Sequence, residues 1–223
     1  MRVILATMLL AGGVLAGPVP GVVAHAEPEA CPPVCDQIPD TAWIGSQAIP
    51  LNSTYRWPSL AAAAVPITGR APRFRFEELC ATPPSAQDTR DSAVGARAVV
   101  SNPEGQWQLQ AQVLHWRGDT ARGGQNATSV FNAATAALRG CQLGAPAQSP
   151  SVTVDGLNRL AAVISGPVIM HTYLVAHPQS STVSELTLWS SAPPQVSWPV
   201  ILDDQVLDAM TAPLCTAYIG SCP

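Results

Sequence analysis

The most regular part of the chain is a strict alternation of polar and apolar residues between positions 106 and 113. Glutamines occupy one set of positions and apolar side chains the other: Gln106, Gln108, Gln110 and Gln112 against Trp107, Leu109, Ala111 and Val113. A period of two places successive side chains on opposite faces of a β-strand. The glutamine face is interpreted as a solvated sheet face, with binding of a sugar or peptide through the amides as the alternative.

A second alternation over 94–100 precedes this strand, and the turn-forming residues 102–105 lie between the two. Two alternating segments joined by turn residues predict a β-hairpin. The alternation changes phase at Val113 and Leu114, so we expect a β-bulge there that returns Trp116 to the core side.

Helical periodicity replaces the alternation after Gly123 and Gly124, which are expected to end the hairpin unit. Between residues 126 and 141, apolar side chains recur at spacings of three and four. This predicts an amphipathic helix that ends near Gly140 and carries Cys141 on its apolar face. Four further strands are predicted beyond it, separated by glycine, proline and serine turns: 151–155, 159–164, 168–177 and 182–189.

The last predicted element is a helix after Pro199, capped by Asp203 or Asp204 and kinked or ended by Pro213. The order of elements is therefore two strands, a helix, several strands and a final helix. This order indicates an α+β fold, in which an antiparallel sheet packs against the amphipathic helix and the C-terminal helix.

Residues 1–26 have the organisation of a secretory signal peptide, with Arg2, an apolar run to Ala16 and small residues at Ala24 and Ala26. The run is shorter than the roughly 20 apolar residues that span a bilayer, so a membrane anchor is the weaker interpretation. Cleavage after Ala26 would leave a secreted or periplasm-like cell-envelope protein with no integral membrane segment.

Residues 27–93 are rich in proline, which interrupts every candidate element in this region. We expect a short helix over 58–64, a brief strand at Phe74 and Phe76, and otherwise an irregular segment that wraps the domain at 94–223. The two parts are expected to form one unit, with disulfides stapling the N-terminal wrap in place.

Six cysteines lie beyond the predicted signal peptide: Cys31, Cys35, Cys80, Cys141, Cys215 and Cys222. An even number in an exported chain favours disulfides, and the absence of a Cys-x-x-Cys spacing argues against a metal site. Cys215 and Cys222 are expected to pair across a short loop, and the remaining pairings stay open. No cofactor and no metal is expected.

The charged residues of the chain exclude several classes of function. The 223 residues include 11 basic side chains, all of them arginine, and 15 acidic ones, for a net charge of −4. Without lysine there is no P-loop lysine, no Schiff-base lysine and no Ser-x-x-Lys nucleophile. The mild acidity lacks the basic footprint of nucleic-acid binding. An anionic ligand would need arginine or backbone N–H groups, and Arg117 and Arg122, near the predicted hairpin end, are the first candidates.

The chain contains neither a Gly-x-Ser-x-Gly nor a His-Glu-x-x-His motif. His115, His171 and His177 could serve as the base of a serine–histidine site, but their strand positions favour ordinary half-buried histidines. Trp107 and Trp189 are expected in the core, whereas tryptophans in irregular segments could line a groove. The candidate ligand-binding residues are therefore Trp43, Trp57, His115, Arg117, Arg122 and Trp198.

Residues 130–141, with the sequence Val-Phe-Asn-Ala-Ala-Thr-Ala-Ala-Leu-Arg-Gly-Cys, carry a resemblance to a known family. A strand pair, an alanine-rich helix ending in cysteine, further strands and a final helix resemble the extracellular sensor domain of actinobacterial membrane serine/threonine kinases. That family has freestanding exported relatives, and a lysine-free chain rich in alanine and arginine suits a high-GC actinobacterium. The resemblance spans 94–220 and implies ligand binding in a polar cleft, without a kinase or a membrane helix.

In that family the helix cysteine pairs with a cysteine that follows it in the sequence. Residues 142–214 of this chain contain no cysteine, so the resemblance implies an N-terminal or C-terminal partner for Cys141. The main prediction is a secreted or cell-envelope ligand-binding, sensor-like protein without catalytic activity. Its partner would be a small molecule, glycan, lipid or envelope protein. The alternatives are an envelope hydrolase with a serine–histidine site and a structural accessory of an envelope or secretion complex.

Overall fold

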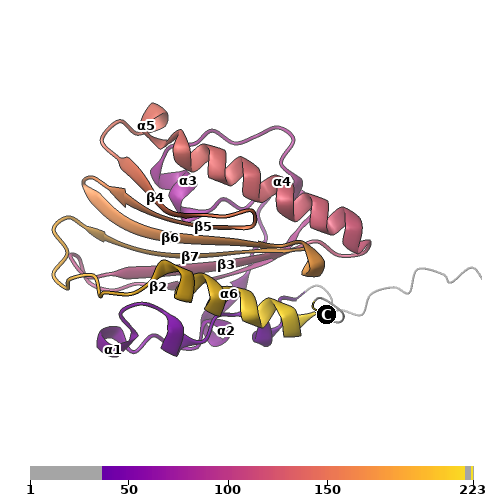
Figure 1. The fold of residues 1–223 in the computed structure, drawn as a ribbon, viewed down its shortest axis with the longest axis horizontal. Coiled ribbons are helices and arrows are strands. Elements are labelled where there is room, and N and C mark those ends of the chain that lie inside the picture. Colours follow the sequence, from indigo (N-terminus) through magenta and orange to yellow (C-terminus); the bar gives the residue numbers. More distant parts are fainter. Residues whose placement is uncertain (1–36, 219–221, 223) are drawn as a thin grey trace, which may run out of the picture. The chain divides into compact units, whose positions relative to one another are not determined.

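Seven antiparallel strands form a single sheet in the computed structural model, which describes residues 37–218 and 222 (Figure 1). Across the sheet the strand order is β1-β2-β3-β7-β6-β5-β4. The strands are β1 Ala64–Pro66, β2 Val94–Val100, β3 Gln108–His115, β4 Ser149–Asp155, β5 Arg159–Ser165, β6 Val168–His177 and β7 Thr182–Ser191. The predicted hairpin is β2 and β3, and the four later strands are β4 to β7, so the expected antiparallel sheet is confirmed.

Helices cover both faces of this sheet. They are α1 Asn52–Tyr55, α2 Leu60–Ala63, α3 Arg75–Leu79, α4 Thr120–Arg139, α5 Cys141–Gly144 and α6 Asp203–Ala217, with 3-10 turns η2 Asp40–Ala42, η3 Ser46–Ala48, η4 Thr89–Ser92 and η5 Pro178–Ser180. In Figure 1, α3 and α4 lie on one side of the sheet, and α6, α1 and α2 lie on the other. The amphipathic helix and the C-terminal helix therefore pack on opposite faces, and the α+β class is confirmed.

Each face of the sheet carries its own hydrophobic cluster, because alternate side chains of a strand point to opposite faces. In β6, Met170 and Leu174 belong to the cluster that includes Phe131 of α4. Tyr173 and Val175, whose side chains point to the opposite face, belong to the cluster on the α6 face. Almost every residue of β6 and β7 is consequently buried.

The interpretation of the glutamine face as solvated is wrong for Gln110 and Gln112, whereas Gln106 and Gln108 are partly exposed. Gln110 is 5% exposed and Gln112 is 0% exposed, because the segment that leads into α3 lies over this face. Arg97 on β2 holds that segment in place: its guanidinium donates to the side-chain oxygen of Gln112 (2.8 Å) and to the backbone carbonyl of Arg73 (2.9 Å). The N-terminal wrap thus covers polar side chains as well as apolar ones.

β3 runs without a bulge through the point where the sequence changes phase, so the predicted bulge is wrong. Its pairing with β2 is regular there, with Ala96 opposite Val113 and Gly95 opposite Leu114. Leu114 and Trp116 lie in the cluster on the α4 face, and Val113 lies in the cluster on the α6 face. The phase change has a simple cause: both faces are covered, so an apolar side chain is suitable on either.

The short strand expected at Phe74 and Phe76 is a helix instead, α3. The carboxylate of Glu77 accepts the N–H of Phe74 (2.8 Å), which satisfies one of the free donors at the start of the helix. Both phenylalanines are 0% exposed and pack in the cluster on the α4 face. Helix capping by Glu77 and burial of the two rings, rather than the alternation of residue types, therefore determine that this segment is helical.

α4 begins at Thr120, earlier than expected, and contains the glycine pair that was expected to end the hairpin unit. Asp119 caps the helix, since its carboxylate accepts the N–H of Arg122 (2.9 Å). A Cβ atom on Gly124 would lie 2.7 Å from the carbonyl oxygen of Pro178. Glycine is needed here for the close approach of η5 to the helix, not for a turn.

α6 continues past Pro213, so this proline does not end the helix, and the alternative of a kink stays a prediction. An interior proline costs a helix about 3 kcal/mol. Leu207 and Met210 before the proline and Leu214 after it are buried on the sheet. Each buried side chain of this kind contributes about 1.5–3 kcal/mol, which together outweighs the cost of the proline.

Two disulfides join described residues. Cys80–Cys141 ties the end of α3 to the start of α5 across 61 residues of sequence, so it staples the wrap to the rest of the fold. It gives Cys141 an N-terminal partner, one of the two that the resemblance implied. Cys215–Cys222 is the local pair that the sequence predicted, and it is confirmed.

Some expectations concern residues that the structure does not describe. The predicted signal peptide at 1–26 and the cysteines Cys31 and Cys35 lie outside the described residues. Within residues 37–218, no helix combines the length and the apolar character that crossing a membrane requires.

Candidate functional site

Most of the polar and titratable candidate residues meet at one end of the sheet, where β6 turns into β7 through η5. The N–H of Trp116 donates to the carbonyl of Ser181 (2.9 Å), and the hydroxyl of Ser181 donates to the carbonyl of Thr120 (3.3 Å). The turn therefore lies against both the end of β3 and the start of α4. We refer to residues 115–124 and 177–182 as the η5 end.

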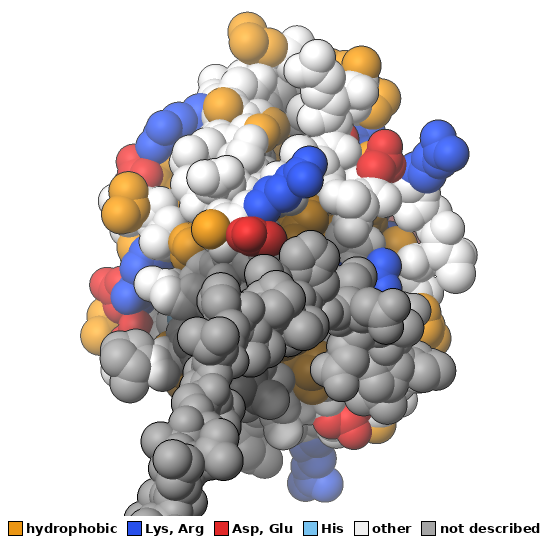
Figure 2. Space-filling model, turned by 90° about the vertical axis from the view of Figure 1, so that its right-hand side faces the viewer, with side chains coloured by type: hydrophobic (Ala, Val, Ile, Leu, Met, Phe, Trp, Pro, Cys, Tyr) orange, Lys and Arg blue, Asp and Glu red, His pale blue; other side chains and the backbone are white. Residues whose placement is uncertain are grey.

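Figure 2 shows the molecule from the side on which α4 begins in Figure 1. Among the described side chains visible there, charged groups are few, and several arginine and acidic side chains lie next to one another, with uncharged side chains between these groups. This agrees with a charged-residue content of only 12%.

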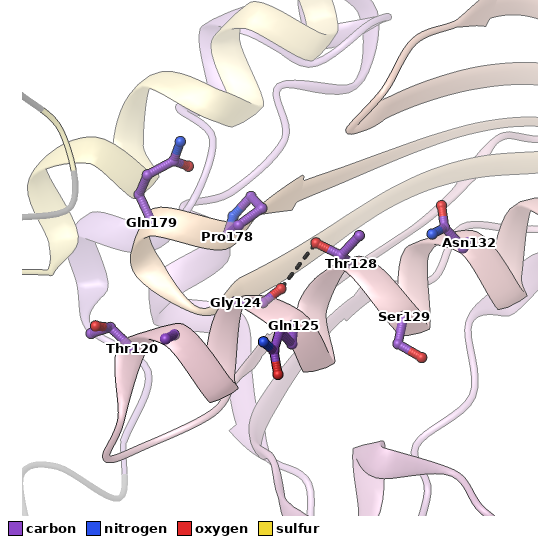
Figure 3. A pocket seen from close by; sticks show the side chains of 9 residues that line it. Thr120, Gly124, Gln125, Thr128, Ser129, Asn132, Pro178 and Gln179 are labelled. Carbon is purple, nitrogen blue, oxygen red and sulfur yellow. Dashed lines mark hydrogen bonds between the residues drawn. The ribbon is translucent and has the colours of Figure 1, made fainter.

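A groove of about 720 Å³ runs between the exposed side of α4 and η5 (Figure 3). Its walls combine amide, hydroxyl and small apolar groups: Thr120, Ala121, Gly124, Gln125, Thr128, Ser129, Asn132, Pro178 and Gln179. In Figure 3, Pro178 and Gln179 stand on the η5 side, opposite Gly124 and Thr128 on the helix. No charged side chain is among the lining residues, and the groove is wide open to solvent.

The candidate arginines Arg117 and Arg122 border a second pocket, of about 370 Å³, beside the first turn of α4. Trp116 forms part of its wall and is fixed there because its indole N–H donates to the carbonyl of Thr89 (2.9 Å). Asp119, which caps α4, borders the same pocket. The structure thus brings the two arginines together, with a carboxylate beside them.

His115 and His177 lie on either side of Ser180. The Nδ1 atom of His115 is 3.0 Å from the backbone carbonyl of Ser180, and its ring stacks on Tyr218 with centroids 4.2 Å apart. The Nδ1 atom of His177 is 2.8 Å from the hydroxyl oxygen of Ser180. Burial lowers the pKa of both histidines, and for His115 the bond to Ser180 partly opposes the shift.

The Ser180–His177 pair does not have the geometry of a nucleophilic serine. Ser180 is only 3% exposed, and its hydroxyl donates to the carbonyl of His177 (3.2 Å). In a catalytic triad the second imidazole nitrogen is held by a carboxylate. Here that nitrogen, Nε2, faces the sulfur atoms of Cys215 and Cys222. This contact gives the hydrolase alternative no support.

The three candidate tryptophans lie away from the η5 end. Trp57 is 4% exposed and its indole N–H donates to the carbonyl of Pro50 (2.7 Å), so it is a core residue. Trp198 stacks on His171 on the α6 face. Trp43 borders a cavity of about 260 Å³ beside the edge strand β1 and its neighbour β2.

A buried polar cluster beneath α3 has no counterpart among the predicted sites. Glu185 on β7 is 0% exposed, and its carboxylate accepts the N–H of Arg75 (2.7 Å) and the hydroxyl proton of Thr187 (3.1 Å). Burial raises its pKa to about 8. Close by, Glu77 pairs with Arg90 at 2.6 Å. The bond between Arg75 and Glu185 fastens α3 to the sheet, and the Glu77–Arg90 pair joins α3 to η4, so the cluster positions the wrap.

The groove residues on α4 were also missed by the sequence reasoning, although a signal for them exists. The polar side of the predicted helix carries Gln125, Thr128, Ser129 and Asn132, all uncharged. Solvated helix faces usually carry charged residues, so an uncharged polar stripe marks a surface suited to hydrogen bonding with a neutral ligand. The contribution of Gln179 could not be foreseen, because it depends on how η5 meets α4.

His177, Cys215 and Cys222 are a set of described residues whose ligand atoms could hold a metal ion, since these atoms lie within 4.8 Å of one another. The two cysteines form a disulfide in this structure, and disulfide sulfurs are not the thiolates that bind metals. A metal could bind this set only after reduction.

Comparison with known proteins adds no relatives, because the chain matches no protein-family model, no curated protein and no solved structure. The resemblance to kinase sensor domains therefore stays a prediction.

Proposed function

We propose that this chain is an exported ligand-binding protein whose ligand occupies the groove between α4 and η5. The observation that carries the proposal is the groove itself, about 720 Å³ in volume and lined without a charged side chain. Export is supported by the predicted signal peptide and by the two disulfides, which are typical of oxidising compartments.

The exposed surface of the groove is mostly apolar, with amide and hydroxyl groups among it and no charge, and we propose a neutral envelope glycan as its ligand. The amides of Gln125, Asn132 and Gln179 each donate and accept hydrogen bonds, as sugar hydroxyls require. Pro178 and Ala121 offer the small apolar surfaces that suit the C–H faces of a sugar ring. A charged ligand would find no counter-charge among the residues that line this groove.

Titration of the ¹⁵N-labelled chain with neutral cell-wall oligosaccharides, followed by NMR, tests this function. Amide shifts are expected at residues 120–132 and 178–179. The double substitution Gln125→Ala and Asn132→Ala should weaken binding at least tenfold, since it removes two hydrogen-bonding side chains worth about 1 kcal/mol each. Both side chains are exposed, so the fold should be retained.

Gln142→Ala is the matched control, because Gln142 is an exposed amide on α5 that does not line the groove. It should bind like the wild-type chain. Shifts confined to other parts of the protein, or equal weakening by the control, would refute the groove as the binding site. Shifts with charged but not neutral sugars would refute the proposed ligand class.

A further inference from the structure

His177 lies directly against the disulfide at the C-terminal end of α6. Its Nε2 atom is 3.5 Å from the Sγ atom of Cys222 and 3.8 Å from the Sγ atom of Cys215. The residue is 7% exposed, so little solvent reaches it. Neither sulfur of a disulfide carries a proton, and neither can therefore donate a hydrogen bond to this nitrogen.

Ser180 determines which nitrogen of His177 carries the proton. The Ser180 hydroxyl donates to the carbonyl of His177 (3.2 Å), so its oxygen has to accept from Nδ1, at 2.8 Å. In the neutral ring, a proton on Nδ1 leaves the lone pair on Nε2, the atom that faces the two sulfurs. A histidine that binds a metal is oriented in this way, with its other N–H held by a neighbouring oxygen.

The two disulfides differ in exposure. Cys80 and Cys141 are each 1% exposed, whereas Cys215 and Cys222 are partly exposed. Exposed disulfides are the ones that thiol reductants attack, because exchange requires access to a sulfur atom. Of these two disulfides, Cys215–Cys222 is therefore expected to be reduced first.

We propose that the reduced Cys215 and Cys222 form, together with His177, a binding site for a zinc-class divalent ion. Two thiolates and one imidazole are a ligand set that zinc accepts, with a fourth position left for water. The three ligand atoms already lie within 4.8 Å of one another. Small side-chain rotations would bring them to roughly 2.3 Å (sulfur) and 2.0–2.1 Å (nitrogen) from a common ion.

The chemistry balances with a dithiol as reductant. The dithiol supplies two electrons and two protons, breaks the S–S bond and itself becomes a disulfide, which leaves two protein thiols. The metal ion then displaces both thiol protons to solvent, and Nε2 binds it through its lone pair. The end of α6 would thus exist in an oxidised, metal-free state and a reduced, metal-bound state.

Anaerobic titration with Co²⁺, a spectroscopic probe for zinc sites, tests the proposal on the full chain reduced with a phosphine. We expect a thiolate-to-cobalt charge-transfer band and the visible bands of tetrahedral cobalt, both abolished by added Zn²⁺. The oxidised chain should show neither band. Cys222→Ser and His177→Asn should each abolish or strongly weaken binding. Ser180→Ala should weaken it by about 10–100-fold, as expected for loss of the group that orients a ligand.

His115→Asn is the matched control, because His115 also contacts Ser180 but does not face the sulfurs. It should bind Co²⁺ like the wild-type chain. The other four cysteines are unchanged in every variant, so any metal they bind is a common background. Binding that is unaffected by both Cys222→Ser and His177→Asn, or equal binding by the oxidised chain, would overturn the proposal. So would a reduced chain that binds no Co²⁺, and none of these outcomes bears on the glycan groove.

Discussion

The imidazole of His171 stacks on the indole of Trp198, with ring centroids 3.5 Å apart and ring planes 6° apart. The indole of Trp107 packs on the imidazole as well, with centroids 5.7 Å apart. Burial lowers the pKa of His171 to about 4, although the carboxylate of Asp203 opposes the shift. At neutral pH His171 is therefore an uncharged packing residue, as its strand position suggested.

This stacking predicts an acid-dependent loss of stability. An unfolded chain protonates a histidine near pH 6.5, whereas His171 in the folded chain resists protonation until about pH 4. The stability from its neutral burial is full above pH 6.5 and is lost as the pH falls from 6.5 towards 4. Urea unfolding at several pH values in this window should show a smaller loss for His171→Phe than for the wild-type chain. Equal losses would contradict the role given to His171.

The burial of Glu185 leads us to expect the opposite pH dependence of stability. Its folded-state pKa is raised from 4.5 to about 8, chiefly by burial, so the folded chain holds this proton more tightly than the unfolded chain. The contribution of the protonated Glu185 to the stability of the fold is complete below pH 4.5 and is lost as the pH rises from 4.5 towards 8. Glu185→Gln should keep the bond from the N–H of Arg75 and should flatten the loss, as measured by thermal unfolding.

Glu78→Gln provides the control for that experiment, since Glu78 pairs with Arg75 on the surface. Surface substitutions of this kind change stability by within about 0.5 kcal/mol. The control should therefore follow the wild-type pH profile. If Glu185→Gln also follows it, the carboxyl of Glu185 does not titrate as the buried position requires.

The two disulfides should differ in what their removal costs. Cys80–Cys141 closes a loop of 61 residues and Cys215–Cys222 one of only 7. The loop-entropy relation assigns about 4 kcal/mol to the first and about 2 kcal/mol to the second. Paired cysteine-to-alanine variants of each, compared by urea unfolding, check this order. A larger loss on removing Cys215–Cys222 would show that its contacts matter more than its loop.

Gly124→Ala should destabilise the chain although alanine favours helices by about 1 kcal/mol over glycine. The added Cβ would lie 2.7 Å from the carbonyl oxygen of Pro178, so η5 would have to move away from α4. Gly140→Ala, at the end of the same helix, meets its nearest atom at an ordinary 3.5 Å and should be neutral or slightly stabilising. The difference in melting temperature between the two variants measures the cost of moving η5.

The strands could be predicted from the sequence, because each of them either alternates between polar and apolar residues or is bounded by turn-forming residues. β2 and β3 alternate strongly and are separated by turn residues, and β4 to β7 are bounded by glycine, proline and serine. The Cys215–Cys222 pair could be predicted for a similar reason, since two cysteines 7 residues apart lie close together in the chain whatever the rest of the fold does. Helix boundaries were less predictable, as Gly124 and Pro213 show, because contacts with other elements override their usual local preferences.

The candidate site was only partly accessible from the sequence. Arg117 and Arg122 could be placed near one another because they are close in the chain and flank the start of α4. The contact of His177 with Cys215 spans 38 residues and depends on how α6 lies across the sheet. No local sequence pattern predicts a contact of this kind, so it could be found only in the tertiary structure.

The α+β order of elements, the antiparallel strands and the local disulfide can all be predicted from the sequence, because each follows from a pattern within a short segment. The tertiary structure alone decided which faces of the sheet are covered. A period of two distinguishes the faces of β3 but does not say whether the wrap will cover the glutamine face. Burial of Gln112 and Glu185 became possible only because Arg97 and the backbone of α3, distant in sequence, supply hydrogen bonds there.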